Sequence, residues 1–317
     1  MPYKHIPVML NEVVHYMNCK PGNICVDCTL GGSGHSRAVL EKIMPDGLLI
    51  GIDQDINAIK NAQEILKPYA SNIRLFHGNY ANLPEFLSEL DIHAVDGILL
   101  DLGISLDQLE SSGRGFSFKR DEPLDMRMNV EWDIKAGDLV NGMEEQKLAN
   151  VFREYGEERW AKRIARNIAK ARKHKKISSS KELAQIVVDS VPAKASARQK
   201  IHPATRVFMA LRIAVNKELE NLTLFMKKII SKDNCAILNS KGRLCVLSFH
   251  SLEDRIVKHH IKAMEKGCDC PPEIPRCICN KKKVVQNLTR KVQRPSDREI
   301  AVNPMARSTK LRAAEKL

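Results

Sequence analysis

The sequence predicts an α/β fold in which a doubly wound, Rossmann-like sheet is interrupted by an inserted α-helical domain. Short apolar runs alternate with helical patterns over about the first hundred residues, which is typical of a parallel sheet. Strand-like patterning is then missing from about residue 104 to 200 and returns before the C-terminus. The chain of 317 residues, 43% of them hydrophobic, is long enough to bury one or two cores.

The first part of the chain is expected to alternate strands and helices. Runs rich in Ile, Leu and Val predict buried strands, and the segments between them predict helices. The expected strands are 24–28, 48–53, 73–76 and 95–101, and the expected helices are 36–44 and 57–66. Ligands bind beyond the carboxyl ends of such strands. The residues expected at that edge are Asp27, Asp53, Asn79, Tyr80 and Asp101.

The inserted domain is expected to be helical and to recognise the substrate. Helical patterns occur at 144–155, 158–173 and 180–190, the last with Ser180 as its expected N-cap. A long helix from Ala204 to about Ile230 and a strand over 243–249 resume the sheet domain. The predicted sheet domain comprises residues 1–112 and 203–317, the latter with a basic tail, and the predicted insertion comprises residues 113–202.

The positive charge of the chain is concentrated in two segments. The net charge is +13; residues 153–206 hold 15 Lys or Arg against 5 Asp or Glu, and residues 280–317 hold 11 against 3. The rest of the chain is therefore net acidic. An acidic body with two basic segments favours a nucleic-acid partner, although each run alone also fits a solvated helix face. The basic residues expected to contact phosphates are Arg153, Arg159, Lys162, Arg163, Arg166, Lys170 and Arg172.

The start of the chain and its cysteines indicate a cytoplasmic protein. The first twenty residues lack the basic and apolar regions of a signal peptide, and no apolar run is long enough to span a membrane. Several of the nine cysteines fall in predicted buried strands, which indicates reduced thiols. The pairs Cys268-x-Cys270 and Cys277-x-Cys279 are expected to be reduced cysteines. A metal site is the first alternative, disfavoured because C-x-C is tighter than the usual C-x-x-C spacing and no histidine joins them, and a transient disulfide is the second.

A glycine loop, Gly31-Gly32-Ser33-Gly34-His35, follows the first strand and predicts a cofactor site. The third glycine of a dinucleotide fingerprint is missing, which favours S-adenosylmethionine over NAD, although an ordinary tight turn also fits. Asp53 ends the second strand, where a carboxylate can accept both ribose hydroxyls. Its alternative role is to cap the next helix, but Asp55 or Asn57 could do that. Tyr80 is expected to pack against an adenine.

Asp101 ends the fourth strand and is the expected catalytic residue. Methyltransferases hold the reacting nitrogen of the substrate at this position. An exocyclic base amine is a poor nucleophile, because its lone pair is delocalised into the ring. A carboxylate that accepts its N–H bonds localises the pair and takes the proton after transfer. The aromatic side chains considered for stacking on the base are Phe116, Phe118, Phe249 and His250, each of which also fits an ordinary core or loop role.

Six ordered motifs carry a resemblance to one family. They are 27–36 (DCTLGGSGHS), 101–105 (DLGIS) with Gln108-Leu109, 123–128 (PLDMRM), 155–158 (YGEE), 202–206 (HPATR) and 248–255 (SFHSLEDR). With them, the chain resembles the ribosomal RNA small-subunit methyltransferase H family, also called MraW, over nearly its whole length. It departs from the family at Tyr80, where many relatives have phenylalanine, and at Leu106, which replaces a serine.

The resemblance implies a class I S-adenosylmethionine-dependent methyltransferase. It implies methyl transfer to N4 of a cytidine in the decoding centre of bacterial 16S rRNA. The cofactor contacts that carry over are Ser33, Gly34, His35, Asp53, Tyr80, Asp101 and Gln108, and no metal ligand is expected among them. The sequence leaves open whether the substrate is naked rRNA or the small subunit, and whether the chain forms a homodimer.

Two other functions compete with this interpretation. An assembly factor that binds S-adenosylmethionine and RNA without catalysis would share the basic segments, but it would not need Asp53, Asp101 and the glycine loop together. A dinucleotide oxidoreductase would need the missing glycine and would have no use for the basic segments. Binding of S-adenosylmethionine or of NAD discriminates between these classes.

Overall fold

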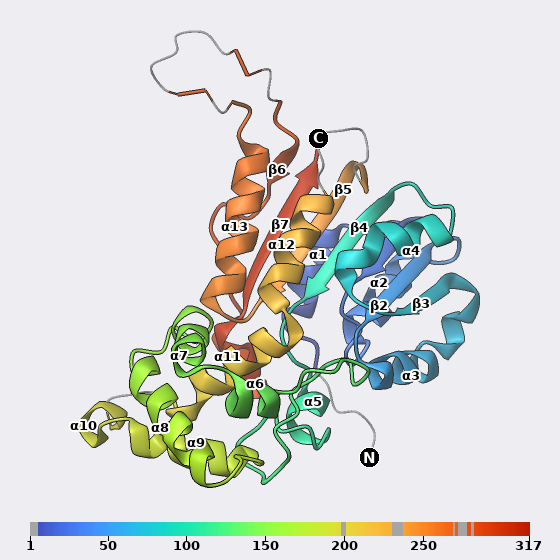
Figure 1. The fold of residues 1–317 in the computed structure, drawn as a ribbon. Helices are drawn as coiled ribbons and strands as arrows, with labels where there is room; N and C mark the ends of the chain where they lie inside the picture. The colour runs from blue at the N-terminus through green and yellow to red at the C-terminus, as the bar shows by residue number, and fades with distance from the viewer. Residues whose placement is uncertain (1–5, 198–200, 230–236, 269, 272–277, 280–281) are drawn as a thin grey trace. The chain divides into compact units, whose positions relative to one another are not determined.

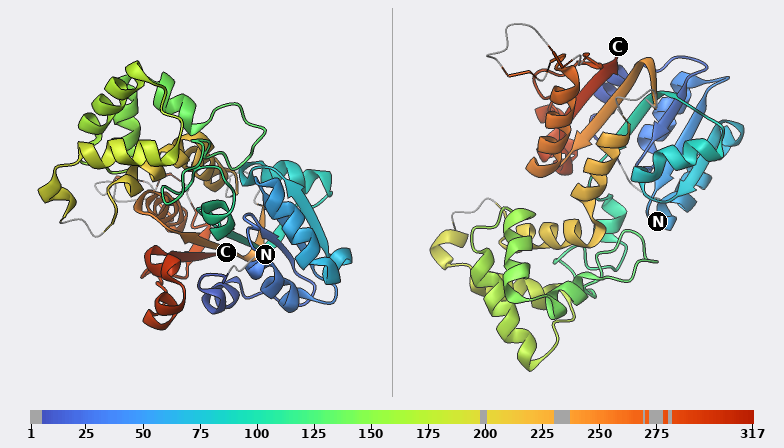
Figure 2. Two further views of the ribbon diagram at one scale, coloured as in Figure 1. Left: turned by 90° about the horizontal axis from the view of Figure 1, so that it is seen from below. Right: turned by 45° about the horizontal axis from the view of Figure 1, so that its top comes forward.

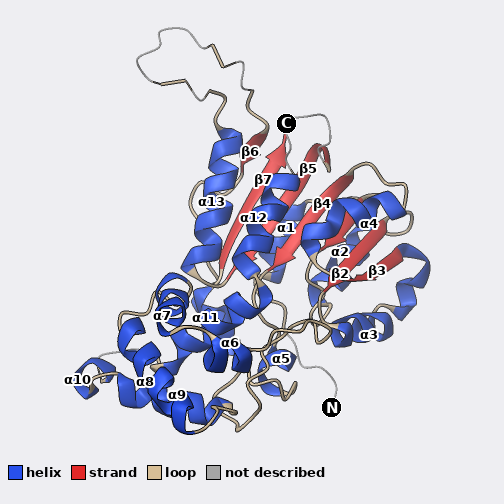
Figure 3. Cartoon of the chain, viewed as in Figure 1, coloured by secondary structure: helices blue, strands red, loops and turns tan. Residues whose placement is uncertain are grey.

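A computed structural model describes residues 6–317 except 198–200, 230–236, 269, 272–277 and 280–281. The chain divides into two compact units: residues 1–103 with 219–317, called here the sheet unit, and residues 104–218, called the helical unit. Figure 1 shows the course of the chain, and Figure 3 separates its helices from its strands. None of the helices in the described part of the chain is both long enough and apolar enough to cross a membrane.

The sheet unit is built on a seven-stranded sheet with the order β3-β2-β1-β4-β5-β7-β6. The strands are β1(Ile24–Asp27), β2(Leu48–Asp53), β3(Ile73–His77), β4(Val95–Asp101), β5(Leu238–Ser248), β6(Val285–Asn287) and β7(Lys310–Lys316). The first five strands pair in parallel, and β7 runs antiparallel to both β5 and β6. The predicted doubly wound sheet is therefore confirmed, and the bounds of β2 and β4 agree with those expected from the sequence.

Sequence patterning missed two strands and shortened a third. β5 begins at Leu238 rather than at Arg243, and β6 and β7 were not expected. β7 escapes detection because Arg312, its third residue, is charged. Its guanidinium Nε donates to Asp254 Oδ1 at 2.6 Å, and the side chain is buried. An ion pair thus replaces the apolar side chain that a buried strand normally shows at such a position.

Successive strand residues point to two separate cores, one on each face of the sheet. On β4, Ile98 and Leu100 belong to one core and Leu99 to the other. The first core is covered by α4(Leu83–Glu89), α12(Glu218–Lys228) and α13(Ser251–Glu265), and the second by α1(Leu10–Met17), α2(Gly34–Ile43) and α3(Ile56–Ile65). Figure 2 gives two further views of these layers. The remaining elements of this unit are α14(Asp297–Val302) and the 3-10 helices η1(Lys67–Asn72), η2(Tyr80–Asn82) and η3(Pro304–Ser308).

The helical unit has its own apolar core. Its helices are α5(Leu106–Glu110), α6(Ala136–Gly142), α7(Glu145–Glu154), α8(Ala161–His174), α9(Ser180–Ser190), α10(Ala193–Ser196) and α11(Ala204–Asn216). The three helices expected here correspond to α7, α8 and α9. The N-cap of α9 is Ser179, not Ser180, because the Ser179 side chain accepts a hydrogen bond from the Glu182 amide. The Ser180 hydroxyl instead donates to the Arg120 carbonyl at 2.7 Å.

The prediction of one long helix from Ala204 to about Ile230 is wrong, because two helices occupy this segment. Lys217 adopts a left-handed conformation with φ of 50°, which ends α11 at Asn216 and begins α12 at Glu218. The unit boundaries also lie at 103/104 and 218/219 rather than at the expected 112/113 and 202/203. The insertion is longer because α11 packs Val207, Phe208 and Leu211 into the helical core.

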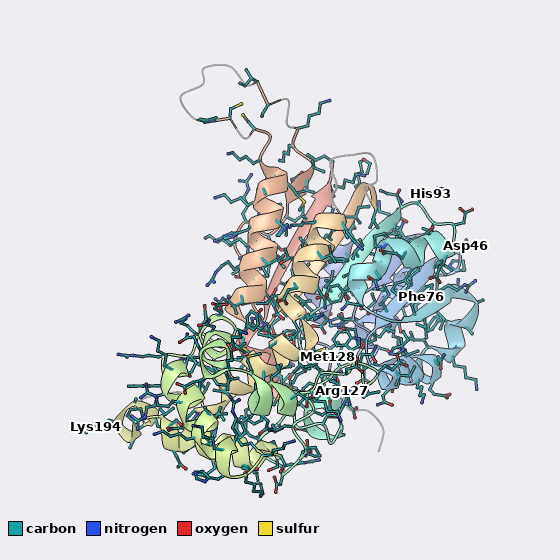
Figure 4. All side chains as sticks on the ribbon, viewed as in Figure 1. Asp46, Phe76, His93, Arg127, Met128 and Lys194 are labelled. Carbon is teal, nitrogen blue, oxygen red and sulfur yellow. The ribbon has the colours of Figure 1, made fainter. Side chains whose placement is uncertain are left out.

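The PLDMRM segment orders a long loop within the helical unit. The Arg127 guanidinium donates to both Asp125 carboxylate oxygens at 2.7 and 2.8 Å, and to the carbonyls of Val130 and Trp132. The Met128 amide donates to Asn216 Oδ1 at 2.7 Å. Figure 4 labels Arg127 and Met128. This motif, singled out in the sequence for its resemblance, therefore connects the loop to the end of α11.

Candidate active site

Three aspartates end three neighbouring parallel strands of the sheet unit. Asp27 ends β1, Asp53 ends β2 and Asp101 ends β4, and β1 pairs with both of the others. Parallel strands bring their carboxyl ends to one edge of a sheet, where ligands bind in this class of fold. The edge expected from the sequence to hold the polar side chains therefore exists.

The loop between β1 and α2 is fastened to β2 by Asp53. Asp53 Oδ2 accepts from the Gly31 amide at 3.0 Å, and Oδ1 accepts from the Asp55 amide at 2.8 Å. Gly31 has a φ of +43°, where a side chain would be strained. Asp55 is the N-cap of α3 and accepts from the Asn57 amide. Asp53 is therefore not a helix cap, and its two carboxylate oxygens offer about four acceptor positions in all.

Gly34 is required by packing within the protein. A Cβ at this position would lie 2.9 Å from Pro7 Cγ, closer than real side chains approach. The sequence-based explanation, close approach of the backbone to a ligand, is thus not needed for this glycine. Pro7 also precedes Val8, whose carbonyl contacts the loop as described below. The segment before α1 therefore forms one wall of the loop.

Asp27 is a buried acid to which the sequence assigned no role. It is 1% exposed; its Oδ2 accepts from the Ser36 hydroxyl at 2.6 Å, and its Oδ1 accepts from the Thr29 amide at 3.1 Å. Burial raises its pKa to about 6, against the hydrogen bond from Ser36 and the charge of His35, which lower it. An acid at the end of an apolar run was the signal available in the sequence. Asp27 holds both ends of the loop in place.

His35 and Asp101 form a buried pair. His35 Nε2 lies 2.9 Å from the Val8 carbonyl oxygen, so this nitrogen carries a proton, and Nδ1 lies 3.5 Å from Asp101 Oδ2. Burial alone lowers the pKa of His35, but the hydrogen bond and charge of Asp101, together with Asp27, raise it above its usual range. The geometry thus favours an imidazolium, with a proton on each nitrogen, beside the Asp101 carboxylate.

The second oxygen of Asp101 has a different environment from the first. Asp101 Oδ1 and the Ser33 hydroxyl are buried and have no hydrogen-bond partner among the described residues. The Asp101 amide donates to Thr29 Oγ1 at 2.6 Å, which fixes the end of β4 against the loop. Buried polar atoms are normally paired, so these two indicate a polar ligand. A cofactor with ribose hydroxyls and an amino-acid part offers groups of the required kind.

Asp53 suits the ribose of such a cofactor. It lies within the fold, and burial raises its pKa to about 6, opposed by hydrogen bonds from the Asp55 and Gly31 amides. A ribose hydroxyl that donates to the Asp53 carboxylate would stabilise its charged form. The residues present therefore fit an adenosine-containing cofactor at this edge of the sheet.

Two of the residues expected to bind the cofactor have contacts of another kind. Tyr80, in η2, is 6% exposed, and its ring meets that of Phe225 edge to face, with centroids 5.4 Å apart. Gln108 belongs to the helical unit, where it forms a capping box with Ser105 at the start of α5. Both residues are thus placed by packing or capping, and their cofactor contacts stay predictions.

Two of the aromatic side chains considered for base stacking have partners of their own. Phe118 stacks on His202, with ring centroids 4.5 Å apart and an interplanar angle of 22°, within the helical unit. His250 caps α13 in a capping box with Glu253. Phe249 lies against the backbone of Gly103, where an added Cβ would approach its ring to 3.3 Å. Phe118 and His250 therefore have structural roles, and Phe249 lies close to the end of β4.

The doubly wound sheet, the loop after β1 and the acids at the ends of β1, β2 and β4 define a class I methyltransferase. This class places a nucleoside cofactor at the carboxyl edge of the sheet. The chain belongs to the MraW methylase family, whose model matches residues 2–317. As a member, it is a methyltransferase that uses S-adenosylmethionine as methyl donor. The fold and cofactor predicted from the sequence are thus confirmed.

Relatives are similar to this chain over their full length. It is 51% identical over 317 residues, with both chains covered completely, to a protein of Desulfosudis oleivorans named ribosomal RNA small subunit methyltransferase H. It is 45% identical over 317 residues, again with complete coverage, to a protein of the same name from Clostridioides difficile. Among solved structures, an rRNA methylase from Streptococcus thermophilus matches over 99% of each chain, with 11% identity and a TM-score of 0.41.

Proposed function

We propose that this protein methylates N4 of a cytidine in the decoding centre of bacterial 16S rRNA, in the cytoplasm. Support for a ribosomal RNA substrate comes from the names of relatives that are 45 to 51% identical over the whole chain. The observation that carries the chemistry is the pair formed by His35 and Asp101. It holds one carboxylate oxygen of Asp101 and leaves the other buried without a partner among the described residues.

In this proposal, the loop and strand ends hold the cofactor. Bound S-adenosylmethionine supplies an electrophilic methyl group on its sulfonium. Asp53 accepts the ribose hydroxyls while its amide contacts keep the loop in place. The loop residues Ser33, Gly34 and His35 line the amino-acid end, with the Ser33 hydroxyl as a hydrogen-bonding group. Tyr80 borders the adenine, and Gln108 contacts the cofactor around its reacting end.

Asp101 acts on the amine of the substrate. Its Oδ1 accepts a hydrogen bond from the exocyclic N–H, which directs the nitrogen lone pair toward the methyl group. As the new N–C bond forms, the methyl–sulfur bond would break and leave a neutral thioether; the nitrogen, now positively charged, would lose a proton to this oxygen. His35 is a positioning residue in this step: its ring holds Oδ2 and balances the carboxylate charge. The Val8 carbonyl in turn fixes the orientation of the ring.

The helical unit supplies the exposed positive charge for RNA binding. Six of the seven basic side chains expected to contact phosphates are exposed: Arg153, Arg159, Lys162, Arg163, Arg166 and Lys170. Arg172 differs, because it is half-buried and its guanidinium donates to the Val140 carbonyl at 2.7 Å. We therefore assign phosphate contacts to the six exposed residues and a structural role within the helical unit to Arg172.

The test is methyl transfer from labelled S-adenosylmethionine to three substrates: small ribosomal subunits, free 16S rRNA and DNA. The subunits and rRNA come from a strain that lacks this modification, and the labelled nucleoside is identified by mass spectrometry. We expect N4-methylcytidine at one position of the rRNA. Labelling of another base or position would contradict the proposed substrate. Cofactor binding with no methylation of any of the three would favour the non-catalytic assembly factor.

Asp101→Asn separates catalysis from binding. The amide is isosteric and leaves the fold intact, but it cannot take the proton, so a loss of about 100-fold or more in turnover is expected. Calorimetry should show S-adenosylmethionine affinity within about tenfold of the natural protein, because only one of its contacts changes. Asp46→Asn, at an exposed position, is the matched control and should keep full activity. Full activity of Asp101→Asn would rule out the proposed role.

A further inference from the structure

Three cysteines between α13 and β6 bring their sulfur atoms together in the sheet unit. Cys268 and Cys270 are half-buried and Cys279 is exposed, and their Sγ atoms all lie within 4.8 Å of one another. The Sγ atoms of Cys268 and Cys279 are 3.8 Å apart. Cys277, the fourth cysteine that the sequence analysis considered, lies outside the described residues. The three described cysteines converge although the first and the last are eleven positions apart in the sequence.

The separation of the sulfur atoms suits a shared metal ion. A disulfide requires sulfur atoms about 2.05 Å apart, well below the 3.8 Å between Cys268 and Cys279. Zinc binds thiolates at about 2.3 Å in a tetrahedral arrangement, which separates its ligand atoms by about 3.8 Å. The Cys268–Cys279 distance therefore matches the edge of a zinc–thiolate tetrahedron.

Backbone amides contact two of these sulfur atoms. The Cys270 amide donates to Cys268 Sγ at 3.4 Å, and the Ile278 amide donates to Cys270 Sγ at 3.4 Å. In metal sites such N–H groups orient the ligand atoms. Two of the three sulfur atoms thus already accept a backbone hydrogen bond that would orient them toward a shared ion. This is a second observation, independent of the spacing.

We propose that Cys268, Cys270 and Cys279 bind a structural Zn²⁺ ion. Thiolate ligands select a soft or borderline metal over Mg²⁺ or Ca²⁺, and cysteine-rich sets that a fourth ligand completes are typical of structural zinc. The sequence favoured plain reduced cysteines because C-x-C spacing is tight. In the structure, the Sγ of Cys279 meets those of Cys268 and Cys270, so the tight C-x-C spacing does not prevent these three thiols from converging.

The ion would order the connection that carries the edge strand β6 and two exposed lysines. The residues that flank this connection are hydrogen-bonded to one another: the Val284 amide donates to the Met264 carbonyl at 3.0 Å, and the Asn287 amide donates to Glu265 Oε1 at 3.4 Å. These bonds hold the start of β6 beside the end of α13. Lys282 and Lys283, which are exposed, follow the cluster directly. The two hydrogen bonds hold the connection where it leaves α13 and enters β6, and zinc would hold it at the cysteines.

The test measures metal content in the full-length protein, purified without a metal-affinity tag. Inductively coupled plasma mass spectrometry should find close to one zinc ion per chain. After dialysis against a weak chelator, Cys268→Ser and Cys279→Ser should each retain less than about a tenth of the zinc of the natural protein. The reason is that a tetrahedral site loses most of its affinity for the metal when one of its ligands is removed. Cys19→Ser, with its sulfur 3.6 Å from Cys25 and outside the cluster, is the control and should keep its zinc.

A second measurement keeps the test decisive if a variant fails to fold. The natural protein, stripped of metal and reloaded with Co²⁺, should show the absorption of tetrahedral cobalt and a thiolate charge-transfer band with the intensity of at least three thiolates. Natural protein without zinc would overturn the proposal. So would cluster variants that keep as much zinc as Cys19→Ser, or a cobalt spectrum showing two thiolates or fewer.

Discussion

The buried carboxyl group of Asp27 makes the free energy of unfolding decrease as the pH rises, and one substitution can remove this dependence. Its pKa is about 6 in the folded protein against an ordinary 3.8. Between these values the folded chain keeps a proton that the unfolded chain has lost. Stability is therefore fully present below pH 3.8 and decreases as the pH rises through 6. Replacing Asp27 with asparagine removes the ionisation and should remove this loss.

The structure sets the size of the effect. At 1.36 kcal/mol per pKa unit, a pKa of about 6 corresponds to about 3 kcal/mol of destabilisation at pH 8. Asparagine preserves both hydrogen bonds: its Oδ1 can accept from the Thr29 amide, and its amide nitrogen can donate to the Ser36 hydroxyl, which then reorients. Asp27→Asn should therefore gain about 3 kcal/mol at pH 8, about half of that at pH 5 and about 0.5 kcal/mol at pH 4.

The assay is urea unfolding followed by far-ultraviolet circular dichroism at these three pH values. Fluorescence of tryptophan is unsuitable, because Trp132 and Trp160 both lie in the helical unit and Asp27 lies in the sheet unit. Asp46→Asn is the control and should change stability by less than about 0.5 kcal/mol throughout. A variant at Asp27 that is no more stable than the natural protein at pH 8, or a gain that does not shrink toward pH 4, would refute the reasoning.

Three further predictions concern the helix break, the glycine loop and the RNA surface. Lys217→Gly should stabilise the helical unit by about 0.5–1 kcal/mol in urea unfolding followed by tryptophan fluorescence, because glycine adopts φ of 50° without strain; an unchanged midpoint would contradict this. Gly34→Ala should weaken S-adenosylmethionine binding measured by calorimetry, because the added Cβ would lie 2.9 Å from the Pro7 ring. Adding Pro7→Ala to the same chain should restore part of the lost affinity. If it restores none, the steric cause is disproved. Lys162→Glu with Arg163→Glu should weaken binding to small subunits and lower the slope of log K against log salt by about two, if each contacts one phosphate; a slope equal to that of the natural protein would exclude them.

Much of the site could be predicted because its residues fall at strand ends. Asp53 and Asp101 end strands whose apolar runs are plain in the sequence, and the glycine loop follows another. It was also foreseeable that Asp53 does not cap the next helix, because Asp55 was available as the N-cap and does perform that role. Local sequence thus sufficed where backbone pattern and side-chain chemistry coincide.

The contacts between distant segments were not predictable in this way. The buried role of His35 depends on Val8 and Asp101, and the need for Gly34 depends on Pro7. β7 was missed because Arg312 makes a buried ion pair with Asp254, 58 residues away. No local pattern records such partners.

The sequence by itself determined the fold class, the position of the cofactor edge and the family, because hydrophobic periodicity and ordered motifs are local properties of the chain. Only the tertiary structure decided that Lys217 divides a continuous helical pattern, that Asp27 is buried as an acid and that three cysteines converge. The physical reason is that each of these depends on which atoms surround a residue. Burial, pairing and left-handed backbone are set by the surrounding packing, and the same residue types elsewhere would be exposed, unpaired or helical.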